Sequence, residues 1–312
     1  MNIRYFSKSG LNFIEVANDL DLKVVLCDLG ASVFQIYFDH TLMSRNVATI
    51  EDYKLPNCYY GKTVGRTFNR LKGYRFEIHD EVYTLEKNEG NNVLHGGVNG
   101  LSTKKFSPSV KAYGWYIEVR YHYDSPHLEA GYPGNVNLDV IYIIYKDNNR
   151  LDIRYEASSD LDTLFSLSNH TFFTLGDKDI SNIELFIRGG HYLKVDRDLL
   201  PISKIEVSPT FDFRKYQLLA NEYDNFFYFD EMNPTLINVS LRNKKYRMDI
   251  FTNFEGAQVY TSNNVPNFSL KDSDNLPHDS VAVEPSDSFL YFPVLKKGEQ
   301  YTRGISYIFL KR

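Results

Sequence analysis

Four short motifs hold side chains that could bind and activate the hydroxyl groups of a small polyol. An amide and a guanidinium stand in Gly65–Arg70, one imidazole in Asn92–Gly97, and a second imidazole in the apolar run Ser166–Phe173. A fourth motif, Val281–Pro285, ends a short apolar strand on the carboxylate of Glu284. Such groups form hydrogen bonds in fixed directions, which suits sugar hydroxyls. An imidazole and a carboxylate brought together from distant strands could act as general acid and base on one sugar.

Each of these side chains also has a purely structural interpretation. A histidine in a β protein is often a satisfied structural group, which applies to His170 taken alone. A carboxylate at a strand end, such as Glu284, is usually solvated, and Asn69 with Arg70 could brace a turn. The motifs by themselves therefore leave catalysis and structure both open.

Metal chemistry has little support in the spacing of the ligand-type residues. The eight histidines form no H-x-H or H-E-x-x-H pattern, and Cys27 and Cys58 belong to no metal motif. We therefore expect no metal site, and we expect both cysteines to be small buried side chains. Six histidines lack any motif and are interpreted as surface or structural residues: His40, His79, His122, His127, His191 and His278.

The elements that position these motifs are predicted to be strands. Leu138–Tyr145 and Arg150–Tyr155 flank a polar turn and predict a β-hairpin, and Phe76–Ile78 with Val82–Leu85 predict another. The 24 Tyr and 22 Phe suit pleated surfaces, and most of their rings should fill the core. Strands without intervening helices predict an all-β fold, an antiparallel sandwich or barrel. Further predicted strands are Trp115–Tyr123, Tyr246–Thr252, Ala257–Thr261, Val281–Val283 and Ile305–Leu310.

Length, charge and hydropathy narrow the class of protein. With 312 residues, 43% of them hydrophobic, and no linker or repeat, we expect a single domain over 1–312. The net charge of −5 and the lack of a basic run argue against a nucleic-acid partner. No apolar stretch approaches the ~18–20 residues that a membrane helix needs, and no signal-like segment opens the chain. We therefore expect a cytoplasmic protein without a membrane partner.

The ordered set of motifs resembles that of the aldose 1-epimerases, the galactose mutarotase family. Nine pieces occur in the same order along nearly the whole chain, which makes coincidence improbable. They are Leu29–Val33, Gly65–Arg70, Leu94–Gly97, Gly131–Gly134, Ser168–Phe173, Val195–Asp196, Phe211–Arg214, Gln258–Thr261 and Glu284–Pro285.

The resemblance implies a large antiparallel β-sandwich of the galactose mutarotase type, with few short helices and an open cleft. It implies that His170 is the acid and Glu284 the base of a ring-opening reaction on a free hexose, which requires no cofactor. The partner is then a small sugar, and the protein a monomer or homodimer. The residues implied to hold the sugar are Asn69, Arg70, His95, Asp224 and Gln258.

The chain also departs from the family pattern. Asn225 stands where relatives often have His, and Pro285–Ser288 replaces the segment that usually follows the glutamate. Both changes leave the proposed acid, base and sugar-holding residues intact. The preferred hexose, with galactose and glucose as leading candidates, stays open.

Two alternatives accompany this interpretation. A hexose-6-phosphate epimerase should present two or more cations at the pocket mouth, and only Arg70 is clearly placed there. Four other cations surround the first motif, and strand alternation would turn some of them outward: Lys62, Arg66, Lys72 and Arg75. A sugar-binding protein without catalysis is the second alternative, although a pure binder would not need both His170 and Glu284.

Overall fold

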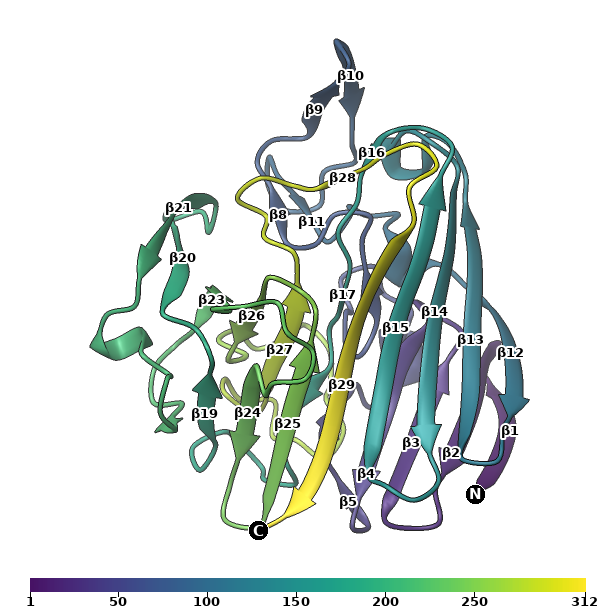
Figure 1. The fold of residues 1–312 in the computed structure, drawn as a ribbon, viewed down its shortest axis with the longest axis vertical. Coiled ribbons are helices and arrows are strands. Elements are labelled where there is room, and N and C mark those ends of the chain that lie inside the picture. Colours follow the sequence, from purple (N-terminus) through teal and green to yellow (C-terminus); the bar gives the residue numbers. More distant parts are fainter.

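The computed structural model describes residues 1–312, and its regular secondary structure is almost entirely antiparallel strands (Figure 1). The prediction of an all-β fold is therefore confirmed. The largest sheet has nine strands, in the spatial order β12 (Ser107–Ala112), β13 (Tyr116–Ser125), β14 (Val136–Tyr145), β15 (Arg150–Ser159), β29 (Tyr301–Lys311), β25 (Tyr246–Thr252), β24 (Val239–Arg242), β19 (Glu184–Ile187) and β22 (Gln217–Leu218).

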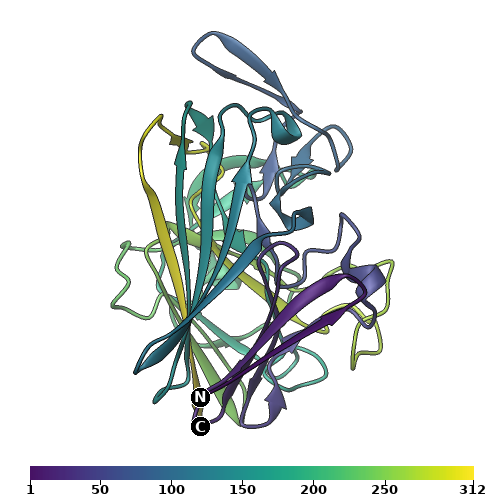
Figure 2. The same ribbon diagram turned by 90° about the vertical axis from the view of Figure 1, so that its right-hand side faces the viewer.

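Two further sheets pack against the nine-stranded sheet. Figure 2 shows the purple N-terminal strands facing its teal strands. The five-stranded sheet has the order β1 (Asn2–Lys8), β2 (Leu11–Ala17), β3 (Leu22–Cys27), β4 (Ser32–Phe38) and β5 (Thr41–Leu42). The seven-stranded sheet has the order β21 (Pro201–Glu206), β20 (His191–Val195), β23 (Asp224–Tyr228), β26 (Gly256–Tyr260), β27 (Val281–Ser286), β18 (Phe172–Phe173) and β6 (Ser44–Arg45).

Alternating apolar side chains build the core between these sheets. In β13, Ile117, Val119 and Tyr121 are buried, and the residues between them are only half-buried. Residues two apart along a strand share a face, so this alternation turns one face of the sheet inward. A single cluster of 52 buried hydrophobic residues draws on all three sheets. Cys27 and Cys58 are free and buried, as predicted.

Both predicted hairpins are present. Strands β14 and β15 pair from Val136 with Ser159 to Ile144 with Leu151. The second hairpin, β9 (Arg75–Ile78) with β10 (Glu81–Thr84), projects from the top of the molecule in Figure 1.

Short two-stranded ladders connect the sheets and carry several of the motifs. They are β8 (Arg70–Leu71) with β11 (Val93–Leu94), β7 (Thr63–Val64) with β17 (Ser168–Asn169), and β16 (Thr163–Leu164) with β28 (Val294–Leu295). Helical structure is limited to α1 (Ile50–Tyr53) and three single 3₁₀ turns at Leu101–Thr103, Glu129–Gly131 and Pro209–Phe211. None of these helices has the length and apolar character needed to cross a membrane.

Candidate active site

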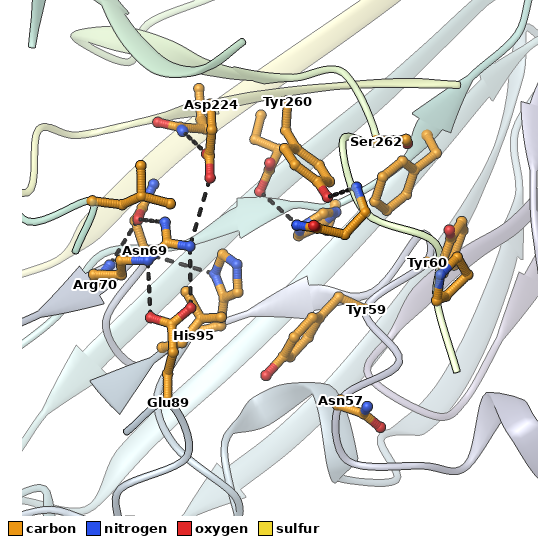
Figure 3. Close-up of a pocket in the computed structure, with 18 of the residues that line it drawn as sticks. Asn57, Tyr59, Tyr60, Asn69, Arg70, Glu89, His95, Asp224, Tyr260 and Ser262 are labelled. Carbon is orange, nitrogen blue, oxygen red and sulfur yellow. Dashed lines mark hydrogen bonds and ion pairs between the residues drawn. The ribbon is translucent and has the colours of Figure 1, made fainter. Parts of the chain in front are cut away.

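An open pocket of about 340 Å³ is lined by strands of the seven-stranded sheet and by the loops beside it (Figure 3). This volume lies at the small end of ligand pockets and suits a molecule the size of a monosaccharide. The structure brings together every site residue predicted from the sequence, although the segments that carry them are far apart in the chain. The seven are Asn69, Arg70, His95, His170, Asp224, Gln258 and Glu284.

Three of the seven come from adjacent strands of the seven-stranded sheet. Gln258 of β26 lies directly opposite Glu284 of β27, and Asp224 of β23 lies opposite Tyr260 of β26. Directly opposite side chains point to one face, as do residues two apart on a strand, so all of them face the pocket. Gln258 Nε2 donates a hydrogen bond to Asp224 Oδ1. The register of the sheet thus assembles this wall.

The β8–β11 ladder places the next group. Leu94 pairs with Arg70, so Asn69 just before β8 meets His95 just after β11. The His95 backbone N–H donates to the Asn69 carbonyl oxygen at 3.1 Å, and the Asn69 backbone N–H donates to His95 Nδ1 at 3.3 Å. Asn69 and His95 have φ values of 59° and 52°, a left-handed conformation that asparagine and histidine adopt more often than most residues.

The bond to Nδ1 determines the tautomer of His95. Because Nδ1 accepts a hydrogen bond, the proton of the neutral ring lies on Nε2. Burial, followed by the effects of His170 and the Arg70 guanidinium, lowers the pKa of His95 well below its ordinary value of 6.5. His95 is therefore a neutral hydrogen-bond donor whose orientation is held by the backbone.

The Arg70 guanidinium is held by two carboxylates. Its Nε and a terminal nitrogen donate to both oxygens of Glu89 at 2.9 and 3.1 Å, and Asp224 Oδ2 lies 3.6 Å away. Asn69 Oδ1 accepts from the Arg70 backbone N–H at 2.8 Å and from its side chain at 3.3 Å. Asn69 thus braces this turn, as its structural interpretation proposed, and also lines the pocket. Glu89 was not found from the sequence, because it lies just before the Asn92–Gly97 motif and outside its bounds.

His170 and Glu284 face each other across the pocket floor. The His170 backbone forms hydrogen bonds with Lys62 O and with the Gly61 N–H, which extend the β7–β17 ladder. His170 Nε2 lies 3.5 Å from Glu284 Oε2, and the two side chains are 8% and 2% exposed. This burial contradicts the solvated alternative for Glu284, which lies inside β27 and not at its end.

Burial also sets the protonation of this pair. It lowers the pKa of His170 to about 4, and it raises the pKa of Glu284 well above its ordinary 4.5. Asp224 acts on Glu284 in the same direction as burial, and Arg70 opposes it. Between these two pKa values, the pair holds one proton.

Comparison with known proteins identifies the family. Residues 12–307 match the family model described as aldose 1-epimerase. The chain belongs to the aldose 1-epimerase family. The galactose mutarotase of Sus scrofa is 28% identical over 293 residues, which cover 84% of this chain and 82% of that protein. The galactose mutarotase of Mus musculus is 32% identical over 232 residues, 69% of this chain and 66% of the relative.

Solved structures agree with this assignment. A galactose 1-epimerase from Lactobacillus acidophilus superposes with a TM-score of 0.88 at 25% identity, over 99% of this chain and 98% of that one. The predicted family, the galactose mutarotase type of fold and the isomerase class of enzyme are therefore confirmed.

Aromatic rings complete the walls of this aldose 1-epimerase pocket. The Tyr59 ring lies nearly parallel to the His170 ring, and their centroids are 5.8 Å apart. The Tyr59 and His95 rings meet at a steep angle, with centroids 4.8 Å apart. Phe172 and Tyr260 stand in recognised motifs, but no motif singled out the other rings among so many Tyr and Phe residues. The remaining rings that line the pocket are Tyr60, Tyr260 and Phe268.

Two of the cations near the first motif turn away from the pocket into the interior. Lys62 is fully buried and its Nζ donates to the Tyr53 carbonyl oxygen at 2.7 Å. Arg66 is 2% exposed and donates to backbone carbonyl oxygens, including those of Pro133 and Gly134 at 2.9 and 3.0 Å. Lys72 and Arg75 are exposed, in agreement with the expectation that some of these cations turn outward, whereas Lys62 and Arg66 turn inward. Both have structural roles: Lys62 binds a backbone carbonyl oxygen, and Arg66 binds carbonyl oxygens and the Ser125 hydroxyl.

The pocket also gathers three potential metal ligands that the sequence spacing did not reveal. One ligand atom from each of His95, His170 and Glu284 lies within 4.8 Å of the others. However, a metal needs an unprotonated ring nitrogen, and His95 Nε2 carries its proton because Nδ1 accepts the Asn69 N–H. The two remaining groups are fewer than the three protein ligands of a typical catalytic zinc site. None of the other six histidines lines the pocket.

Proposed function

We propose that this aldose 1-epimerase interconverts the α and β anomers of a free hexose, with galactose and glucose as leading substrates. The observation that carries the proposal is the close approach of two buried groups, His170 Nε2 and Glu284 Oε2, at 3.5 Å in a pocket of monosaccharide size. Glu284 Oε2 has no hydrogen-bond partner. Leaving a buried carboxyl oxygen unpaired is unfavourable unless a ligand completes it.

The reaction requires one proton to leave and another to arrive at neighbouring sugar atoms. Glu284 takes the proton of the C1 hydroxyl while His170 gives a proton to the ring oxygen, and the C1–O5 bond breaks. Rotation about C1–C2 exposes the other face of the aldehyde, and the reverse transfers close the ring. A positioned acid or base contributes typically ~10²–10⁴-fold to such a step.

The single proton shared by the pair fits this cycle. A protonated Glu284 with neutral His170, and an ionised Glu284 with protonated His170, carry the same number of protons. They interconvert by one transfer between two atoms already 3.5 Å apart. The sugar C1 hydroxyl donates to the carboxylate, and the ring oxygen accepts from the imidazolium. Bound substrate therefore favours the form with ionised Glu284 and protonated His170, which is the form that reacts.

The other polar groups are proposed to hold the sugar hydroxyls. Arg70 and His95 Nε2 are donors, and Asp224 is an acceptor. Gln258 gives its Nε2 hydrogen to Asp224, and its Oε1 has no partner in the structure. Fixing hydroxyls on several sides keeps C1 and the ring oxygen in register with the acid and base.

The test is the rate at which freshly dissolved α-galactose or α-glucose reaches anomeric equilibrium, followed by polarimetry. The protein should accelerate this approach, and Glu284→Gln or His170→Asn should each lower the acceleration by ~10²-fold or more. A variant that retained more than a tenth of the activity while folding normally would disprove the role of its residue. Melting temperatures no lower than that of the wild type provide the control for folding.

A hexose-6-phosphate substrate has less support from the pocket. Its only cationic side chain is Arg70, which faces the carboxyl groups of Glu89, Asp224 and Glu284. A pure sugar-binding role does not explain why Glu284 is buried against His170. A monomeric or homodimeric state and a cytoplasmic location stay predictions.

A further inference from the structure

Glu89 stands at the boundary between the sugar pocket and a second, adjoining hollow. Glu89 and Arg70 line both. The adjoining hollow also contains Lys72 and Arg197, which are exposed and form no ion pair, and one further acid, Asp198. A cationic surface therefore begins where the sugar pocket ends.

The pairing with Glu89 orients the Arg70 guanidinium and compensates its positive charge. Glu89 accepts two hydrogen bonds from the guanidinium, at 2.9 and 3.1 Å. Bidentate pairs of this kind are strong and directional. Arg70 is 12% exposed and Glu89 36% exposed, so the carboxylate lies on the solvent side of the pair. An anion entering from solvent therefore meets the carboxylate before it meets the guanidinium.

We propose that Glu89 determines specificity by excluding phosphorylated hexoses: it orients Arg70 toward sugar hydroxyls and compensates its charge at the pocket mouth. This inference rests on the proposed function, because it assumes that a hexose occupies the pocket. Glu89 contacts Arg70 directly, so it acts as a positioning residue and not as a catalytic one.

The charges around the mouth explain the discrimination. In the proposed pose C1 and O5 lie at His170 and Glu284, and the exocyclic C6 with its phosphate points toward the mouth, where Arg70 and Glu89 lie. With Glu89 present, the one cation of the pocket is already bidentately paired. Without it, Arg70 keeps only the weaker ion pair with Asp224 at 3.6 Å, and Lys72 and Arg197 beside it are opposed by Asp198 alone. Clustered cations are what phosphate recognition employs.

Glu89→Gln tests this role, because the amide keeps the shape of the side chain and one acceptor for Arg70. The ratio of kcat/KM for glucose 6-phosphate to that for glucose should rise about tenfold. The gain should shrink at 1 M salt, where the Debye length falls to about 3 Å. Adding Lys72→Ala and Arg197→Ala to Glu89→Gln should return the ratio to that of the wild type.

Glu77→Gln is the matched control, because it removes the same charge from an exposed position in β9. An equal rise of the ratio in this variant, an unchanged ratio in Glu89→Gln, or an equal loss for both sugars would overturn the inference. Calorimetric binding of glucose and of glucose 6-phosphate to both proteins separates this inference from the proposed reaction. A shifted binding ratio without turnover in the wild type would reject the reaction and retain the role of Glu89.

Discussion

Glu284 and His170 are buried titratable groups whose pKa values move toward the neutral form of each residue. Burial lowers the pKa of His170 to about 4 and raises that of Glu284 well above 4.5. A buried charge is unfavourable unless it is paired. The site therefore destabilises its own charged groups in the absence of a ligand, as functional sites often do.

The pH dependence of the reaction should reflect the single proton of this pair. As pH falls toward about 4, the pair takes up a second proton. His170 and Glu284 are then both protonated, Glu284 can no longer act as a base, and kcat/KM should fall. As pH rises through the raised pKa of Glu284, the pair loses its last proton and kcat/KM should fall again. A profile of kcat/KM against pH should show a plateau with two limbs, and a rate independent of pH between 3 and 10 would contradict this assignment.

The stability of the Glu284→Gln variant should depend on pH in a defined direction. The folded pKa of Glu284 is raised, so wild type and variant should differ least below pH 4.5, where the carboxyl is protonated in both states. Above pH 4.5 the unfolded carboxyl ionises first, which favours unfolding of the wild type by up to about 1.4 kcal/mol per pH unit. The variant should therefore gain relative stability as pH rises, measured by urea denaturation at several pH values. The same gain in Glu77→Gln would show that the burial of Glu284 is not its cause.

At the level of elements, two-residue ladders hold most of the site. Pairing between β8 and β11 places Asn69, Arg70 and His95, and pairing between β7 and β17 places His170. Such short ladders depend on close backbone packing. Gly96, directly after His95, has φ +89°, and a Cβ there would overlap the carbonyl of Gly65.

Gly96→Ala should therefore have two effects: it should destabilise the fold and displace His95. The strained φ and the overlap should lower the free energy of unfolding by roughly 1–3 kcal/mol, and kcat/KM should fall because His95 loses its position. Gly114→Ala is the control, because its φ is not in the left-handed region and no atom lies within 4 Å of its added Cβ. Denaturation and polarimetry measure the two effects, and a Gly96→Ala protein as stable and active as Gly114→Ala would contradict the prediction.

At the level of the whole molecule, three sheets share one hydrophobic cluster that extends from Ile14 to Phe309. Removing any one sheet would expose the apolar faces of the other two. This shared core supports the prediction of a single domain over 1–312.

Unfolding should accordingly be cooperative. Differential scanning calorimetry should give one heat-absorption peak, and the loss of strand circular dichroism and of catalytic activity should share its midpoint. Coincident transitions are the signature of one cooperative unit. Two resolved peaks, or activity lost well before the strands melt, would show that part of the chain forms a separate unit.

Local patterns in the sequence were enough to predict the strands and the family. The β14–β15 and β9–β10 hairpins followed from short runs rich in apolar and aromatic residues on both sides of polar turns, a pattern contained within neighbouring residues. Six of the seven site residues lie in the ordered motifs, Asp224 followed from the family resemblance, and all seven line the pocket.

Tertiary structure alone decided which partner each charged side chain meets. Alternation shows that a side chain leaves one face of a strand, but not whether that face meets solvent, core or pocket. Lys62 and Arg66 point into the interior and Glu284 is buried because distant segments cover them. Glu89 begins a Gly90-Asn91 turn that the sequence could signal, but its pairing with Arg70 comes from the fold. These contacts depend on packing between segments far apart in the chain, which no local pattern encodes.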